Sequence, residues 1–294
     1  MTLRREIAAA LTSAGLDPAE VEAVIRRALE EDLAYGPDVT TEATVPHNAR
    51  ATGVVVPRSA GVLAGVPVAA AVFDLIGGPA VDVVLHATDG TPAEPGRAVL
   101  TVSGPTRALL TAERTALNLV SHLSGVATIT GRWVDAVAGT GAAIRDTRKT
   151  TPGLRALEKY AVRCGGGVNH RMGLGDAALI KDNHVAAAGG LTAAVEAVRA
   201  TAPDVHLEVE CDTLDQVKEA LAAGVELVLL DNFGLGQTRE AVAMVRGTGV
   251  RLEASGGLDL ARAAAVAATG VDYLAVGALT HSAPVLDLGF DLRG

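Results

Sequence analysis

The second half of the chain repeats one pattern, in which a short apolar strand is followed by a segment long enough for a helix. From Ala142 onward the strand-like runs recur with helical stretches of ordinary length between them. They lie near residues 142–146, 177–181, 206–211, 227–231, 251–255 and 272–277. Such units build a parallel sheet with right-handed crossovers. At least six of them favour a closed or nearly closed α/β barrel over an open doubly wound sheet. The lack of a G-x-G-x-x-G motif after the first strand makes a dinucleotide site a weak hypothesis.

The first third of the chain has a mixed pattern that predicts a small α/β domain, which we place at residues 1–106. Helices fit residues 3–13, 18–32 and 66–77, and strands fit residues 51–56, 61–64, 81–85 and 98–102. Residues 31–41 fit a turn-rich linker. The second domain, residues 107–279, begins with a long helical region and continues into the barrel.

Composition excludes several classes of function. The 294 residues carry a formal net charge of −9, which repels a nucleic acid, and only 2% are aromatic, too few for stacking platforms. No run of about 18 apolar residues exists, so no transmembrane helix is predicted. The cysteines, Cys164 and Cys211, are too few for a disulfide framework and lack metal-ligand spacing. We expect a cytoplasmic protein that binds neither nucleic acid nor membrane.

A basic cluster at residues 145–184 stands out on this acidic chain. It holds eight of the 25 lysines and arginines, where even spacing would give about three or four. Because the cluster is local, it suits a pocket for a small, highly charged anion. The first barrel strand is followed by Arg148 and Lys149, the second by Lys181, and the connection between them carries His170 and Arg171.

A helix is predicted within the basic cluster, with Thr151 as its N-cap and Pro152 at its first position. Three basic residues of this helix, Arg155, Lys159 and Arg163, are spaced by four and so share one face, which we expect to be solvated.

Acidic residues and glycine-rich turns follow the later strands. The third strand carries Glu208 and Glu210 on one side, and the fourth ends in Asp231. The turns after the fifth and sixth strands contain Ser255, Gly256, Gly257, Gly277 and Ala278. The active site of an α/β barrel lies at the carboxyl ends of its strands, and glycine turns leading into helices suit phosphate. The pattern therefore predicts two ligands, a small organic polyanion and a phosphorylated, Mg²⁺-bound molecule.

Several long motifs resemble those of one enzyme family, the quinolinate phosphoribosyltransferases, also called carboxylating nicotinate-nucleotide pyrophosphorylases. They are DTRKTTPGLRALEKYAV, GGGVNHRMGLGDAALIKDNH, LEVE, LVLLDN, EASGG and YLAVGALTHSAP, with EDLAYGPDVTT and ERTALN nearer the N-terminus. The resemblance covers the chain from about residue 30 to its end. The departures are few: a proline precedes the aspartate in YGPDVTT, and the first 30 residues carry little specific signal.

The resemblance implies a fold and a reaction. The fold is an open α/β barrel of about seven strands with an N-terminal α/β sandwich domain, to which the tail at residues 280–294 returns. The reaction joins quinolinate and phosphoribosyl pyrophosphate, with Mg²⁺, to give nicotinate mononucleotide, pyrophosphate and CO₂. The family is homodimeric, and the arginine of ERTALN, here Arg114, would reach into the neighbouring subunit's site.

The resemblance also implies roles for individual residues. Those expected to contact substrate are Arg114, Thr147, Arg148, Lys149, His170, Arg171, Lys181, Glu210, Asp231, Ser255, Gly256, Gly257, Gly277 and Ala278. Those expected to be catalytic are Lys149, Lys181, Glu210 and Asp231. Mg²⁺ would be bound, directly or through water, by Glu210 and Asp231. The choice of Glu210 over Glu208 stays open, because both lie on the same side of their strand.

Two other activities remain as alternatives. A Schiff-base lyase or aldolase would also place a lysine, here Lys181, at a barrel strand, but it needs a neutral amine. A related phosphoribosyltransferase could act on another acid, for instance nicotinate, whose single carboxylate leaves the cationic set in excess. A non-catalytic binding role would leave the acids and the phosphate-type turns without a purpose.

Overall fold

The computed structural model of the chain describes residues 2–293, which form two compact units. Unit 1 comprises the chain up to Gly131, Thr150–Gly166 and the chain from Leu279 onward. Unit 2 comprises Arg132–Lys149 and Gly167–Ala278. The chain therefore passes between the units several times. The prediction has fewer crossings, with 1–106 and the tail 280–294 in one domain and 107–279 in the other.

Unit 1 contains a four-stranded antiparallel sheet. Its order is β12-β1-β5-β3, with β1 at Arg50–Pro57, β3 at Asp82–Leu85, β5 at Leu100–Pro105 and β12 at Leu288–Arg293. The last strand pairs with β1 from Thr52↔Arg293 to Pro57↔Leu288. The C-terminal segment is thus an integral strand of this sheet. A separate short pair joins β2 (Gly61–Val62) to β4 (Pro92–Ala93).

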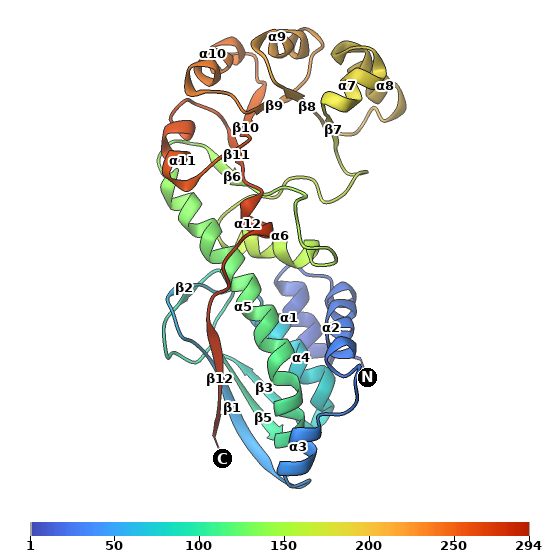
Figure 1. Cartoon of the computed structure of the whole chain (residues 1–294), viewed down its shortest axis with the longest axis vertical. Helices are drawn as coiled ribbons and strands as arrows, with labels where there is room; N and C mark the ends of the chain where they lie inside the picture. The colour runs from blue at the N-terminus through green and yellow to red at the C-terminus, as the bar shows by residue number, and fades with distance from the viewer. Residues whose placement is uncertain (1, 294) are drawn as a thin grey trace. The chain divides into compact units, whose positions relative to one another are not determined.

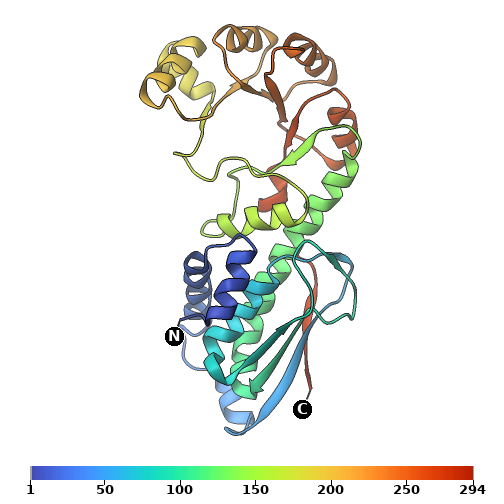
Figure 2. The same ribbon diagram turned by 180° about the vertical axis from the view of Figure 1, so that it is seen from behind.

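The helices of unit 1 pack around a core of aliphatic side chains. They are α1 (Arg5–Ser13), α2 (Pro18–Asp32), α3 (Val39–Thr44), α4 (Val66–Gly77), α6 (Arg155–Cys164) and most of α5 (Thr106–Ala136), with a 3₁₀ turn at Gly78–Ala80. Almost every residue of α4 is buried, because α4 lies against β3 and β5 and is covered by α1 and α2. Figure 2 shows α1, α2, α4 and α5 gathered on one side of the sheet.

Unit 2 contains six parallel strands in the order β6-β11-β10-β9-β8-β7. The strands are β6 (Ala143–Arg145), β7 (Ala178–Ile180), β8 (Leu207–Cys211), β9 (Leu227–Asp231), β10 (Arg251–Ser255) and β11 (Tyr273–Ala275). The outer helices are α7 (Asp182–Ala188), α8 (Leu191–Thr201), α9 (Leu214–Ala222), α10 (Leu235–Val245) and α11 (Leu260–Ala267). Figure 1 shows the strands lining an inner ring with these helices outside it. The short helix α12 (Ala278–His281) follows β11.

The sheet of unit 2 is an open barrel, as predicted. A single parallel bridge between Arg145 and Val168 adds a seventh position beside β6. Within residues 2–293 no ladder joins β6 to β7, so the ring stays open. The strand face beneath the helices is apolar and buried, as at Val209, Val228 and Leu252. The opposite, inner face carries the polar side chains.

Three local predictions are wrong. Thr151 and Pro152 do not begin α6, which starts at Arg155: they belong to a turn closed by the Leu154 N–H on the Thr151 carbonyl (3.0 Å), and Gly153 has φ +82°. Lys159 is fully buried rather than solvated. The third prediction was a linker over residues 31–41, but α3 begins at Val39.

Local capping explains the start of α3, because the Asp38 carboxylate accepts a hydrogen bond from the Thr41 N–H (3.0 Å).

The length and polarity of the helices also bear on membranes. None of the described helices is both long and apolar enough to cross a lipid bilayer.

Candidate active site

The strand register gathers polar side chains on the inner face of the barrel. Residues opposite each other on parallel strands project to the same side, and so do residues two apart on one strand. Glu210 lies opposite Leu229, which lies opposite Glu253, and Asp231 lies opposite Ser255. Two of the predicted acids, Glu210 and Asp231, therefore share the inner face with Ser255 of the predicted phosphate turn.

An ion pair lies at the carboxyl ends of β7 and β8. Lys181, the residue between β7 and α7, directs Nζ to Glu210 Oε2. The side chains are 44% and 12% exposed, so the pair is open to solvent on the lysine side. The structure thus brings together a cation and an acid that the sequence placed at separate strand ends.

A buried cluster lies deeper in the barrel and involves Arg145, His170, Glu208 and Glu253. His170 Nε2 is 2.8 Å from Glu208 Oε2 and 3.7 Å from Glu253 Oε1. Arg145 Nη1 donates to Glu253 Oε2 at 2.6 Å. The two glutamates of β8 therefore differ in surroundings, since Glu208 belongs to this cluster and Glu210 to the more exposed ion pair.

Burial controls the charge of this cluster. Desolvation, assisted by the neighbouring Glu208 carboxylate, raises the pKa of Glu253 to about 7, while Arg145 and His170 oppose the rise. Glu208 Oε1 and Glu253 Oε1 are buried and accept no hydrogen bond from any described residue. Because Glu208 and Glu253 lie together in a region with little solvent, Glu253 retains its proton up to near neutral pH.

The same cluster has the residue types of a metal site, but its hydrogen bonds argue against one. Potential ligand atoms of His170, Glu208 and Glu253 all lie within 4.8 Å of one another. However, the Arg171 backbone N–H donates to His170 Nδ1 at 2.7 Å. Both ring nitrogens therefore already face groups of the protein, and Nε2 faces the two carboxylates in place of a metal ion.

Two guanidinium groups form the cationic half of the site. Burial and the nearby charge of Arg148 lower the pKa of Arg171, an effect that Glu208 and Asp176 oppose. Arg171 Nη1 donates to the Ala177 carbonyl at 2.9 Å. The Arg148 Nε atom is buried and has no hydrogen-bond partner among residues 2–293. Two neighbouring arginines, one with an unsatisfied donor, are suited to a bound carboxylate.

The loop that carries His170 and Arg171 is anchored by an acid that the sequence prediction did not assign to the site. Asp146 is fully buried and accepts hydrogen bonds from the His170 N–H (2.7 Å) and from Asn169 Nδ2 (2.6 Å). The prediction also omitted Arg145 and Glu253. A charge within a short apolar strand, on the inward side of the alternation, was the available signal for both.

The remaining predicted residues occupy the strand ends and one helix. Thr147 Oγ1 accepts a hydrogen bond from the Lys149 N–H (3.0 Å), and Lys149 is exposed. Gly277 precedes α12, whose first residue is Ala278. Arg114 lies in unit 1 on an exposed position of α5, whereas the other site residues lie in unit 2.

A small cavity of about 200 Å³ lies where β9 and β10 end. It is lined by residues that include Asn232, Ser255, Gly256, Gly257 and Arg262. The helices α10 and α11 begin beside it. Two of the predicted phosphate-turn glycines therefore border a space at helix N-termini, a setting that favours an anion.

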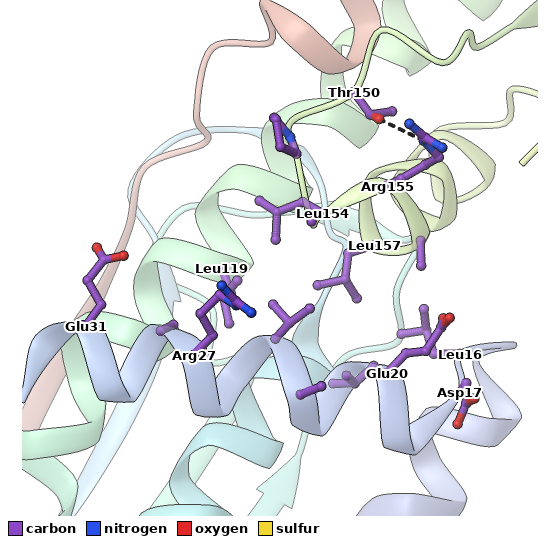
Figure 3. Close-up of a pocket in the computed structure, with 17 residues that line it drawn as sticks. Leu16, Asp17, Glu20, Arg27, Glu31, Leu119, Thr150, Leu154, Arg155 and Leu157 are labelled. Carbon is purple, nitrogen blue, oxygen red and sulfur yellow. Dashed lines mark hydrogen bonds between the residues drawn. The ribbon is translucent and has the colours of Figure 1, made fainter. Parts of the chain in front are cut away.

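Unit 1 has a larger cavity of about 940 Å³, between α2, Leu119 of α5 and the segment from Thr150 to Leu157 (Figure 3). Its walls are largely aliphatic, with charged residues such as Glu20 and Arg27 among them. None of the predicted site residues lines it.

The two cysteines lack the properties of nucleophiles. Both are free thiols. Burial raises the pKa of Cys164 to about 11 and that of Cys211 to about 12, so both stay protonated at neutral pH.

Comparisons with known proteins show the family to which the chain belongs. Residues 38–124 match the quinolinate phosphoribosyl transferase N-terminal domain, and residues 126–291 match the C-terminal domain. The chain is 60% identical to a carboxylating nicotinate-nucleotide pyrophosphorylase of Mycobacterium leprae, over 91% of this chain and 95% of that protein. It is 43% identical to a probable one of Synechocystis, over 90% of each. The structure of nicotinate-nucleotide pyrophosphorylase from Francisella tularensis matches 94% of this chain and 96% of its own, with a TM-score of 0.89 and 37% identity. This chain belongs to the quinolinate phosphoribosyl transferase family.

Proposed function

We propose that this chain transfers the phosphoribosyl group of phosphoribosyl pyrophosphate to quinolinate, with decarboxylation. The products are nicotinate mononucleotide, pyrophosphate and CO₂. The observation that carries the proposal is the pair Arg148 and Arg171, close enough for one charge to depress the other's pKa and including a buried, unsatisfied N–H. The relatives named above bear the name of this activity.

Quinolinate has two adjacent carboxylates, which call for more than one cation. Arg148 and Arg171 would grip them through bidentate hydrogen bonds, with Lys181 as a further charge. Both ring nitrogens of His170 face groups of the protein, so this residue would act mainly by holding Arg171 in place. The exposed Lys149 would reach the second substrate.

The acids Glu210 and Asp231 would hold Mg²⁺ with the pyrophosphate. Their carboxylate oxygens on neighbouring strands suit this hard cation. Each already has a partner, Lys181 for Glu210 and the Asn232 amide for Asp231, which favours contact through the ion's waters. When bound, Mg²⁺ would neutralise charge on the leaving pyrophosphate.

The chain's own groups would then act by orientation and fixed charge. As the pyridine nitrogen displaces pyrophosphate, the ribose becomes cationic, and the Asp231 and Glu210 carboxylates would stabilise that charge. The pyridinium formed in this step stabilises the carbanion left when the 2-carboxylate departs as CO₂, and uptake of a proton at that carbon gives nicotinate mononucleotide. The two arginines need only hold the ring in place during this second step.

The assembly and location form part of the proposal. The enzyme would act as a homodimer in which Arg114 of one subunit completes the site of the other. We also propose that it works in the cytoplasm. A Schiff-base mechanism at Lys181 is disfavoured, because the lysine is engaged in an ion pair with Glu210 and Schiff-base formation requires a neutral amine.

The test combines purified protein with quinolinate, phosphoribosyl pyrophosphate and Mg²⁺. We expect nicotinate mononucleotide and CO₂ in equal amounts, and little product when nicotinate replaces quinolinate. Product formed equally well from nicotinate would point to the related transferase. No product from either acid, with a borohydride-trapped adduct on Lys181 from a keto substrate, would replace the proposal with the lyase.

A further inference from the structure

Asn232 has an unusual backbone conformation directly after a predicted catalytic residue. With φ of +57°, it is the one non-glycine residue with positive φ in the part of the chain that the structure describes. Side chains disfavour this region, and asparagine tolerates it better than most. The conformation follows Asp231 at the end of β9, so it controls how the chain leaves that strand.

Two hydrogen bonds from Asn232 connect the ends of β9 and β10. Its backbone N–H donates to the Ser255 carbonyl at 3.0 Å. Its side-chain Nδ2 donates to Asp231 Oδ2 at 2.6 Å. The first bond fixes the strand ends to each other, and the second restricts the rotation of the Asp231 carboxylate.

The glycine after Ser255 leaves room for this arrangement. Gly256 has φ +86°, and a Cβ placed on it would lie 2.7 Å from the Asn232 backbone nitrogen and closer still to the Asn232 side chain. Asn232 therefore occupies the space that any other residue at position 256 would need. Both residues line the small cavity at the ends of β9 and β10.

We propose that Asn232 is a positioning residue that orients the Asp231 carboxylate and locks it to the Ser255–Gly256 turn. It would thereby couple the acid that faces ribose and Mg²⁺ to the turn that receives phosphate, and so set the affinity for phosphoribosyl pyrophosphate. The inference rests on the proposed function for the identity of this ligand. The restraint on Asp231 can be observed independently of activity.

Two substitutions separate the effect of the Asn232 side-chain amide from the effect of its backbone conformation. Asn232→Gly keeps the positive φ without strain and removes the hydrogen bond to Asp231. Asn232→Asp keeps the size and much of the tolerance of positive φ, but it sets a second carboxylate beside Asp231. Asn48→Gly is the matched control, because Asn48 is an exposed residue of unit 1 outside the site.

For Asn232→Gly we expect a KM for phosphoribosyl pyrophosphate that is raised about tenfold, a loss of about 1.4 kcal/mol in binding. The KM for quinolinate should stay unchanged. The rise in melting temperature caused by phosphoribosyl pyrophosphate with Mg²⁺ should shrink, although the unliganded melting temperature stays near that of the wild type. Asn232→Asp should be more impaired than Asn232→Gly, and Asn48→Gly should behave as the wild type.

Either of two kinetic outcomes overturns the inference. One is a wild-type KM and thermal shift in Asn232→Gly, which would mean that the backbone conformation alone matters. The other is an equal loss for both substrates, which would mean a merely structural role. Crystal structures of the unliganded wild type and Asn232→Gly provide the independent measurement, and an unmoved Asp231 carboxylate also overturns it. Failure of the proposed function would differ, because the wild type itself would form no product.

Discussion

Arg145 and Glu253 form a buried hydrogen-bonded ion pair that spans an intervening strand of the barrel. The Nη1···Oε2 distance is 2.6 Å, and the sheet order places β11 between their strands, β6 and β10. The side chains are 16% and 0% exposed. A second acid, Glu208, lies close to Glu253, so two carboxylates share a region with little solvent and Arg145 pairs with one of them.

The stability of the protein should therefore depend on the protonation of Glu253. The folded-state pKa of about 7 exceeds the ordinary value of 4.5, so the folded chain binds more protons than the unfolded chain between these values. The contribution of this group to stability is full below that window and is lost as pH rises through it. Glu253→Gln is neutral at every pH and can still accept a hydrogen bond from Arg145.

The stability of Glu253→Gln relative to the wild type should be greater at about pH 8 than at about pH 5, because only the wild type loses stability as Glu253 ionises. Thermal unfolding of both proteins at the two pH values measures this gain. The same difference at both pH values would show that Glu253 is ionised throughout. Glu94→Gln, a change at an exposed carboxylate of unit 1, provides the control for general effects of charge.

The ion pair between Lys181 and Glu210 should matter for activity far more than for stability. Because Lys181 is 44% exposed, we expect a coupling energy of at most about 1 kcal/mol in a double-mutant cycle of unfolding. Lys181→Met should lower kcat/KM by about a hundredfold or more, as expected for loss of a preorganised charge. Activity within a few-fold of wild type would remove Lys181 from the catalytic set.

A carboxylate away from the site holds the start of α4. Asp89 accepts hydrogen bonds from the Gly65 N–H (2.7 Å), the Val66 N–H (3.0 Å) and the Tyr160 hydroxyl (2.6 Å). Tyr160→Phe should cost about 1 kcal/mol in the free energy of unfolding, and Asp89→Ala about 1–3 kcal/mol, because backbone donors lose their partner. Urea unfolding measures both. Tyr35→Phe, at a fully exposed tyrosine, should have no effect, and an equal loss there would contradict the explanation.

The fold could be predicted because its signals are local and periodic. Apolar strand runs and the helices between them specify the parallel sheet, and the carboxyl-end rule then brings residues as distant as Lys181 and Glu210 together. The start of α6 was misplaced because Thr151 and Pro152 have the composition of a helix start. Gly153, with its positive φ, decides instead for a turn.

Burial and partner choice could not be predicted, because they depend on contacts between distant segments. Nothing local distinguishes Lys159, which is fully buried, from Arg163 one turn later, which is exposed. Glu208 and Glu210 likewise differ because different residues surround them. His170 faces Glu208, and Lys181 faces Glu210.

The proposed dimer makes a prediction about mixed subunits. Arg114→Ala should be inactive but folded, because Arg114 is exposed on α5, and Lys149→Ala should be inactive because the site loses its own lysine. In a mixed dimer, one site has an intact Lys149 and receives an intact Arg114 from its neighbour, while the other site lacks both. Random re-association would therefore restore about a quarter of wild-type turnover. The measurement is the activity of the two inactive proteins after mixing under conditions that exchange subunits. Activity no higher than the sum of the separate proteins, with exchange verified by tagged subunits, would place Arg114 in the site of its own chain or outside the site altogether.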